Sequence, residues 1–213
     1  MREDIASIRK EYTKDTLDIK SVHRDPISQF ENWFDEALKS GIVEPNAMTL
    51  ATVDQAGSPL QRTVLLKKIA RKAFIFFSNY NSRKALHIDA NAHVSLLFPW
   101  YQLERQVIIC GIASKISTEE TKEYFQSRPR GSQLGAWVSE QSTIIEGRNV
   151  LEDKLRELEN KYSNIPIPVP PHWGGYEVVP STIEFWQGGT NRLHDRILYT
   201  KNGNDWGIDR LSP

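Results

Sequence analysis

The 213-residue sequence predicts a mainly β protein with flanking helices, in which the strands form a closed or partly closed antiparallel barrel. Three observations predict this class. At least six segments have the composition of strands, short turns join most of them, and the few helical segments do not alternate with strands as they do in βαβ folds. We therefore expect the helices to pack on the outside of the barrel.

The beginning of the chain is predicted to be an N-terminal mobile arm over residues 1–25. Ile5, Ile8 and Tyr12 recur at helical spacing, but the segment is short and highly charged. Residues 26–213 are predicted to form a single domain. Its first element is a helix over residues 26–39, where the apolar side chains form one stripe and Pro26 suits the first turn.

A β-rich region follows this helix. Residues 47–53, 60–69 and 72–78 are rich in β-branched and apolar residues, as strands are. The short polar segments between them, at residues 54–58 and 70–71, are typical of hairpin turns. The sequence therefore predicts three neighbouring strands with short connections.

A short helix is predicted to begin after Asn81 or Ser82, either of which can cap it. Arg83 and Lys84 then lie in its first turn, where a positive charge opposes the helix dipole. A bound phosphate would explain this placement.

The central part of the chain contains two nearly continuous apolar segments, at residues 93–100 and 104–116, which predict buried strands. Ser117 and Glu120 have the spacing of a capping box, so a helix is expected to begin there. The Arg128-Pro129 step is expected to end it.

The last third is predicted to contain one helix and three strands. The helix covers residues 143–162, and the proline-rich residues 165–171 form an extended connector. Residues 176–186, 196–199 and 206–208 have the composition of strands that return to the first sheet.

Composition limits the partners and the compartment. The 27 basic and 27 acidic residues cancel, so no overall field favours nucleic acid or an anionic membrane, and neither is an expected partner. The single cysteine, Cys110, excludes a disulfide within the chain and indicates a reducing compartment. With neither a signal peptide nor a bilayer-length apolar segment expected, the prediction is a cytoplasmic protein. The histidines lack the spacing of metal ligands, so no metal site is predicted.

The stretch around Arg192, His194 and Arg196 carries an unusual alternation of cations. In a strand, this spacing would send all three side chains to one face. Gly188 and Gly189 precede them and suggest a sharp turn or a backbone that lies against a flat group. An anionic aromatic ligand would satisfy both features, although an exposed strand with its charges in water is an equal alternative.

Other donor-rich groups occur along the chain. Arg62 and Lys67 lie in an otherwise apolar strand, where a cation is unfavourable unless it is paired, meets an anion, or reaches water from an edge strand. The remaining groups are Arg83 with Lys84, the set Tyr124, Arg128, Arg130 and Ser132, and the pair Gln141-Ser142. Together they suggest more than one bound phosphate group, held by side chains because no glycine-rich phosphate loop is present.

Six ordered motifs between Arg62 and Arg196 resemble those of the pyridoxamine/pyridoxine 5′-phosphate oxidases, and the resemblance runs over nearly the whole chain, from about Ile8 to Pro213. They are Arg62-Thr63-Val64-Leu65-Leu66-Lys67, Ser82-Arg83-Lys84, Glu104-Arg105-Gln106-Val107, Ser127-Arg128-Pro129-Arg130 with Ser132-Gln133, Gly135-Ala136-Trp137-Val138-Ser139, and Glu184-Phe185-Trp186-Gln187-Gly188-Gly189 with Arg192-Leu193-His194-Asp195-Arg196.

This resemblance implies an FMN-binding antiparallel split β-barrel that forms a homodimer. The implied reaction oxidises pyridoxamine 5′-phosphate or pyridoxine 5′-phosphate to pyridoxal 5′-phosphate, with hydride transfer from substrate C4′ to flavin N5 and reduction of O2 to hydrogen peroxide. The implied FMN contacts are Arg62, Thr63, Val64, Leu65, Leu66, Lys67, Phe77, Ser78, Arg83, Lys84, Gln106, Gln141, Ser142, Trp186 and Arg196. The implied substrate contacts are Arg9, Tyr12, Lys67, Tyr124, Arg128, Ser132, Arg192 and His194, the last two being catalytic.

Two other classes of function stay open from the sequence. The first is another member of the flavin split-barrel group, a reductase or a haem-related protein that uses the same barrel on a different substrate. The second is a non-catalytic protein, either one that binds pyridoxal phosphate or a basic sheet that binds single-stranded nucleic acid by aromatic stacking. The zero net charge argues against nucleic acid.

Overall fold

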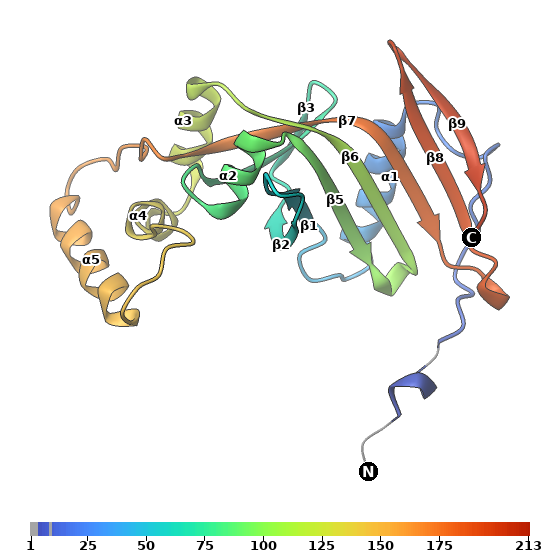
Figure 1. The fold of residues 1–213 in the computed structure, drawn as a ribbon, viewed down its shortest axis with the longest axis horizontal. Coiled ribbons are helices and arrows are strands. Elements are labelled where there is room, and N and C mark those ends of the chain that lie inside the picture. Colours follow the sequence, from blue (N-terminus) through green and yellow to red (C-terminus); the bar gives the residue numbers. More distant parts are fainter. Residues whose placement is uncertain (1–3, 9) are drawn as a thin grey trace. The chain divides into compact units, whose positions relative to one another are not determined.

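The computed structural model describes residues 4–8 and 10–213 and confirms a mainly β fold with flanking helices (Figure 1). The strands hydrogen-bond in the order β2-β1-β5-β6-β7-β4-β3, and β7 also pairs with β8, which pairs with β9. Their bounds are β1 Ala47–Val53, β2 Pro59–Leu65, β3 Lys68–Ala70, β4 Ala73–Asn79, β5 His93–Trp100, β6 Arg105–Lys115, β7 Trp173–Gln187, β8 Asp195–Asn202 and β9 Asp205–Leu211.

In the described part of the chain, the helices are fewer than the strands. They are α1 Pro26–Lys39, α2 Arg83–Ala90, α3 Thr118–Ser127, α4 Arg130–Val138 and α5 Arg148–Lys161, with short 3-10 turns η1 Ile5–Ser7, η2 Tyr101–Leu103 and η3 Thr190–Arg192. None of the helices within residues 4–8 and 10–213 combines the length and the apolar character needed to cross a lipid bilayer.

The chain forms two compact units. The first unit comprises Met1–Leu50, Ser95–Gly111 and Pro180–Pro213, and the second comprises Ala51–Val94 and Ile112–Val179. Strands β1, β5, β6 and β7 contribute residues to both units.

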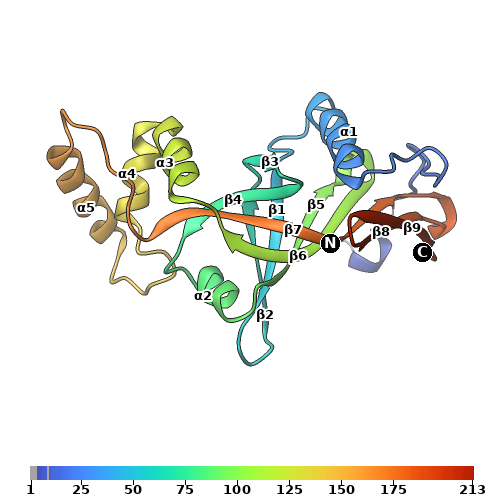
Figure 2. The ribbon, with the colours of Figure 1, turned by 90° about the horizontal axis from the view of Figure 1, so that it is seen from above.

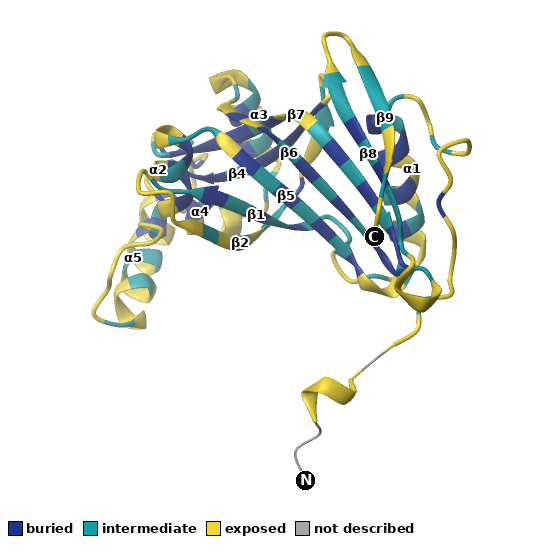
Figure 3. Cartoon of the chain, turned by 45° about the vertical axis from the view of Figure 1, so that its right-hand side comes forward, coloured by how far each residue is buried: buried dark blue, intermediate teal, exposed yellow. Residues whose placement is uncertain are grey.

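The core of the first unit is aromatic. Helix α1, predicted with its observed bounds, buries Phe30 and Trp33. The Phe30 ring lies 4.9 Å from Phe98, and the Trp33 ring lies 5.2 Å from Phe185, both with edge-to-face geometry. Along β5, buried and half-buried residues alternate, so that one face of the strand packs on the core (Figure 3).

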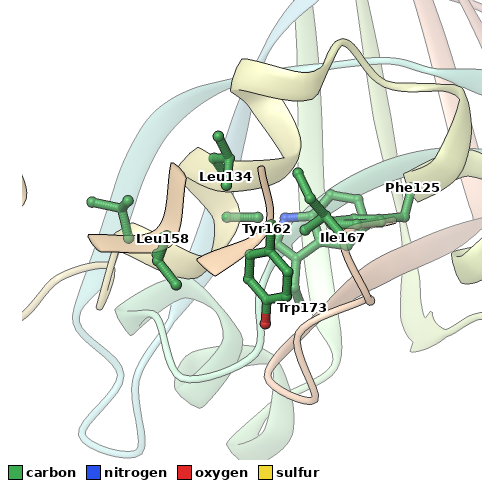
Figure 4. Close-up of a cluster of buried hydrophobic side chains, with 8 residues drawn as sticks. Phe125, Leu134, Leu158, Tyr162, Ile167 and Trp173 are labelled. Carbon is green, nitrogen blue, oxygen red and sulfur yellow. The ribbon is translucent and has the colours of Figure 1, made fainter. Parts of the chain in front are cut away.

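The second unit is built on the antiparallel pair β4 and β7, in which Phe74 lies opposite Val178. Helices α3, α4 and α5 gather at one end of this unit, as two views at right angles show (Figures 1 and 2). Phe125, Leu134, Leu158 and Trp173 point toward one another in the apolar cluster that these helices share with the connector before β7 (Figure 4).

The predicted strand over residues 60–69 is wrong as one element. It divides into β2 and β3, with Leu66 and Lys67 between them. The division has a topological reason, because β2 pairs with β1 whereas β3 pairs with β4. The chain therefore leaves one strand partner and joins another at Lys67, and its β-rich composition gives no sign of the change.

Two helix predictions also need correction. Helix α4 was not predicted, because Gly131 and Gly135 give its sequence a low helix propensity, and burial of Leu134 in the apolar cluster stabilises it instead. Helix α5 begins at Arg148 rather than at residue 143. Gly147 precedes it in an extended conformation, and Ile144 is fully exposed.

Candidate functional site

A cleft of about 820 Å³ lies in the second unit, within the size range of cofactor sites. We call it the cationic cleft, because the described residues in its walls include five basic side chains, Arg62, Lys67, Arg83, Lys84 and Arg128, and no Asp or Glu. The other residues that line it are Leu60, Gln61, Thr63, Val64, Leu65, Phe77, Ser78, Asn79, Ser132, Gly135, Ala136, Ser139, Gln141, Ser142 and Trp173.

Arg62 enters the cationic cleft from β2 and is half-buried. Its Nη1 donates a hydrogen bond of 2.8 Å to Thr52 Oγ1, and that oxygen lies 3.2 Å from His87 Nδ1. Burial lowers the pKa of Arg62, and the nearby Arg83 lowers it further. The side chain is therefore held in place inside the protein and does not extend into water from a strand edge.

The start of α2 brings together four predicted residues that are far apart in the sequence. Lys84 Nζ donates to Gln141 Oε1 at 3.0 Å, and the backbone N–H of Arg83 donates to Ser142 Oγ at 3.2 Å. Lys84 is only 7% exposed, and burial followed by the charge of Arg62 lowers its pKa to about 8. A helix start with two added cations is a favourable place for a phosphate group.

Among the cations of the cleft, Arg128 gives the strongest indication of a bound anion. Its guanidinium lies 4.6 Å from the Trp173 ring and 5.7 Å from the Phe125 ring, and burial lowers its pKa. Its Nη1 is buried and has no hydrogen-bond partner within residues 4–8 and 10–213. A buried donor of this kind destabilises the protein unless a ligand accepts its hydrogen bond.

An aromatic stack stands beside Arg128. The ring centroid of Phe77 lies 3.9 Å from that of Tyr124 and 5.2 Å from that of Trp173, and the rings are nearly parallel. Burial raises the pKa of Tyr124, although the charge of Arg128 acts in the opposite direction. Tyr124 borders a separate cavity of about 190 Å³, which also touches Lys67 and Phe77.

Six residues that line the cationic cleft were not predicted as contacts, and neither was Trp173. The six are Leu60, Gln61, Asn79, Gly135, Ala136 and Ser139, and Asn79 Nδ2 donates to Ser139 O at 3.1 Å. The motif at residues 135–139 was part of the family resemblance, but nothing in it indicated a role. Trp173 follows the proline-rich connector and has no charge or spacing that marks it.

The predicted residues Tyr12, Gln106, Trp186, Arg192, His194 and Arg196 lie in the first unit. Arg9 lies outside the described residues. Leu66, predicted with the Arg62 strand, is buried and does not line the cationic cleft.

The alternation of Arg192, His194 and Arg196 along one strand is wrong. Thr190–Arg192 form a 3-10 turn, and β8 begins only at Asp195. Asn191 and Arg192 have φ values of 54° and 65°, a conformation in which a strand cannot continue. Only Arg196 is a strand residue.

A hydrogen bond at this turn fixes the tautomer of the neutral His194 ring. The backbone N–H of Gly189 donates to His194 Nδ1 at 3.1 Å, so the proton of the neutral ring is on Nε2. Burial lowers the pKa of His194, and Arg192 lowers it further. The ring centroid of His194 lies 4.7 Å from that of Trp186 and 5.8 Å from that of Tyr12. Tyr12 and Arg192 line a cavity of about 350 Å³, whereas His194 lines a different one of about 380 Å³.

The two glycines before the turn are required by close approach, as their sequence predicted. A Cβ on Gly188 would lie 2.7 Å from the Tyr12 ring, and one on Gly189 would lie 2.3 Å from the carbonyl oxygen of Leu193. The flat group that Gly188 faces is therefore Tyr12 of the same chain.

Arg196 differs from Arg192 in its charge environment. Its Nε donates to Glu184 Oε1 at 2.8 Å, and its Nη1 donates to Ser212 O at 2.9 Å. The hydrogen bond with Glu184 raises the pKa of Arg196. Arg192, by contrast, has no carboxylate partner in the described part of the chain.

Comparison with known proteins identifies the family. Residues 34–162 match the family model described as pyridoxamine 5′-phosphate oxidase, and residues 173–213 match the model described as pyridoxine 5′-phosphate oxidase C-terminal dimerisation region. The pyridoxine/pyridoxamine 5′-phosphate oxidase of Rippkaea orientalis is 54% identical over 211 residues, which is 99% of this chain and 100% of the relative. The oxidase of the same name from Vibrio vulnificus (strain YJ016) is 51% identical over 210 residues, with the same coverage.

Solved structures agree with this assignment. PhzG from Burkholderia lata 383, solved in complex with tetrahydrophenazine-1-carboxylic acid, has a TM-score of 0.88 and 28% identity, covering 93% of this chain and 98% of its own. A pyridoxamine 5′-phosphate oxidase-related, FMN-binding protein from Nostoc punctiforme has a TM-score of 0.70 and 18% identity, covering 86% and 97%, and confirms the predicted split-barrel fold. The chain therefore belongs to the pyridoxamine 5′-phosphate oxidase family.

Proposed function

We propose that this protein is an FMN-dependent oxidase that converts pyridoxamine 5′-phosphate and pyridoxine 5′-phosphate to pyridoxal 5′-phosphate, with reduction of O2 to hydrogen peroxide. The observation that carries the proposal is the cationic cleft, where the described residues bring together five basic side chains and no acidic one in a chain of zero net charge. The positive electrostatic field is therefore concentrated in the cleft, and it suits one ligand or a pair of ligands that carry more than one phosphate. The names of the relatives supply the chemical identity of the proposed substrates.

The residues of the cleft fit FMN. Arg62, Arg83 and Lys84 provide the charge for its phosphate, and Ser78, Gln141 and Ser142 provide polar atoms beside it. Val64, Leu65 and Phe77 supply apolar surface for a flat ring. When bound, FMN would supply the hydride acceptor, its N5 atom, for a hydride from substrate C4′.

A second phosphate site is proposed at Arg128. Its unpartnered Nη1, together with Lys67 and the hydroxyls of Tyr124 and Ser132, would hold the phosphate of the substrate. The protein's contribution is then mainly to position the substrate ring.

The remaining roles are assigned to the first unit. Arg192 would lie against the pyridine ring and stabilise charge that develops in the transition state, and His194 would donate from Nε2 to the ring oxygen. Tyr12, with Arg9, would complete the substrate contacts. Gln106, Trp186 and Arg196 would contact FMN. Because residues 173–213 match a dimerisation region, we propose that the active protein is a homodimer.

The direct test combines a spectrum with an assay. The purified protein mixed with FMN and dialysed is expected to keep a flavin absorbance spectrum at about one FMN per chain. Pyridoxine 5′-phosphate should then release one peroxide for each pyridoxal 5′-phosphate formed. Flavin binding without peroxide release would favour a reductase, and binding of pyridoxal phosphate by a colourless protein would favour a non-catalytic carrier.

FMN affinity is expected to fall above about pH 8 because of Lys84. The pKa of Lys84 is about 8 in the free protein, since burial and Arg62 disfavour its charge. A phosphate next to the ammonium group would raise that pKa, so binding above pH 8 requires uptake of a proton. The Kd should be nearly constant from pH 7 to 8 and then rise by up to about tenfold per pH unit.

Flavin fluorescence titrations at pH 7, 8, 9 and 9.5 measure this dependence. The phosphate of FMN is already a dianion over this range, since its second pKa is about 6. Lys84→Met should bind FMN more weakly at pH 7 and lose the rise in Kd above pH 8. If the variant keeps the same pH profile as the native protein, Lys84 is not the titrating group.

A further inference from the structure

Glu104 holds the N-terminal segment by three bonds to one carboxylate. Its side chain is 2% exposed, and its Oε2 accepts hydrogen bonds from the backbone N–H groups of Thr13, at 2.9 Å, and Lys14, at 3.1 Å. Its Oε1 lies 2.9 Å from Lys10 Nζ. The three donors lie on both sides of Tyr12 in the sequence, so one carboxylate binds the backbone just after that ring and the side chain of Lys10 just before it.

The same residue also holds the turn on which Tyr12 rests. The backbone carbonyl oxygen of Glu104 accepts from the N–H of Gly188 at 2.8 Å and from Gln187 Nε2 at 3.2 Å. Glu104 has a φ of 56°, a left-handed conformation that is uncommon for a residue other than glycine. Backbone strain of this kind persists where surrounding bonds over-determine the position.

We propose that Glu104 is a positioning residue for the substrate, acting as a latch that keeps residues 10–14 closed on the Gly188 turn and thereby holds Tyr12 beside His194. The contacts that depend on the latch are the edge-to-face contact of Tyr12 with Trp186, at 5.8 Å, and its contact with His194, also at 5.8 Å. The substrate part of this inference rests on the proposed function, whereas the latch itself does not.

Separate bonds hold the chain after the latch, so opening the latch should leave the fold intact. The N–H of Leu17 donates to Asp195 Oδ2 at 2.9 Å, and Arg210 Nη2 donates to the carbonyl oxygen of Leu17 at 3.0 Å. Asp15 pairs with Arg105 at 2.6 Å. Removal of the Glu104 carboxylate therefore loosens the segment around Tyr12, although Lys14 Nζ still donates to Gln102 O at 2.5 Å, and leaves residues 15–17 attached.

Limited trypsin digestion of the FMN-loaded protein measures the latch directly. Lys10 and Lys14 are cleavage sites within the latched segment, and mass spectrometry identifies cuts after each. Glu104→Ala should speed these cuts by about tenfold or more, because cleavage follows the open population and the variant lacks all three bonds to the carboxylate, from the N–H groups of Thr13 and Lys14 and from Lys10 Nζ. Glu44→Gln is the matched control, since Glu44 has the same φ of 56° but is exposed.

Two further variants separate the latch from a general loss of structure. In Glu104→Gln the amide oxygen can still accept from Thr13 and Lys14, but its NH2 group faces Lys10, so cleavage should rise less than in Glu104→Ala. Adding Lys10→Met removes that conflict. It also removes the trypsin site at residue 10, so the comparison uses the cut after Lys14, whose rate should return from the Glu104→Gln value toward the native value. Equal cleavage in native and Glu104→Ala proteins would overturn the latch, as would a double variant that is cut after Lys14 faster than Glu104→Gln.

Steady-state kinetics with pyridoxine 5′-phosphate test the role in substrate positioning. Glu104→Ala should raise KM by about tenfold with a change in kcat below about threefold and an unchanged FMN content, since only substrate contacts are loosened. Fast cleavage with unchanged KM would keep the latch and refute its role in substrate binding. If no native activity is found, the proposed function fails, and the digestion still decides whether the latch exists.

Discussion

Replacing Arg128 with Met is expected to lower kcat/KM for pyridoxine 5′-phosphate by about 100- to 1,000-fold without lowering the free energy of unfolding. The loss follows from removal of the proposed main cation at the substrate phosphate, a desolvated charge pair of about 3–4 kcal/mol. The unchanged or higher stability follows from the buried Nη1, which has no hydrogen-bond partner in the described part of the protein. Methionine keeps the contact with Trp173 and removes an unsatisfied buried donor.

Arg130→Met, two residues away, is a control that should lower stability and leave kcat/KM nearly unchanged. Arg130 hydrogen-bonds the carbonyl oxygen of Tyr162 and does not line the cationic cleft. Arg130→Met should therefore lower the free energy of unfolding by about 1 kcal/mol and leave kcat/KM within about twofold of the native value. Urea denaturation and steady-state assays on both variants provide the comparison. A stability loss in Arg128→Met that matches its activity loss would mean that Arg128 is mainly structural.

Replacing Arg192 with Met is expected to lower kcat by about 100-fold while FMN content stays unchanged. Arg192 is exposed and lines a cavity together with Tyr12, and no carboxylate among the described residues pairs with it. Its full charge is therefore available to a transition state, and loss of such a group typically raises the barrier by about 2.7–4 kcal/mol. The φ of 65° at this position is unfavourable for methionine and for arginine alike, so the substitution should change the backbone strain energy little.

Rapid-quench or stopped-flow measurement of the reductive step, with FMN content read from absorbance, separates the two properties. Leu193→Gln is a suitable control, because Leu193 is 71% exposed in the same turn and is assigned no role. It should retain near-native kcat. Parallel losses of flavin and of turnover in Arg192→Met would show that Arg192 supports the cofactor instead of the reaction.

Local sequence features determined several elements of the fold. The stripe of apolar residues after Pro26 predicted α1 with its observed bounds, and the continuous apolar segment at residues 93–100 predicted β5. Ser117 accepts from the N–H of Glu120, as the capping box predicted. These elements were predictable because their signals lie within one or two turns of helix or one strand length.

Other elements depend on contacts that the sequence does not display. The break of the second strand at Lys67 arises from a change of pairing partner, and α4 forms against its local propensity because Leu134 is buried in a cluster with Phe125 and Trp173. The turn at Asn191 and Arg192 interrupts an alternation that composition alone presents as a strand. For the strand break and for α4, a partner distant in the sequence supplies the free energy that decides the local conformation.

The sequence by itself determined the family, through ordered motifs, and the chemical character of the site, through cations that need an anion. Only the tertiary structure decided which cations remain available. Arg128 has a buried Nη1 donor without a hydrogen-bond partner among the described residues, and Lys84 has a lowered pKa. Arg196, by contrast, is already paired with Glu184. The physical reason is that the charge state and the hydrogen bonds of an arginine or lysine depend on burial and on neighbours that are distant in the chain.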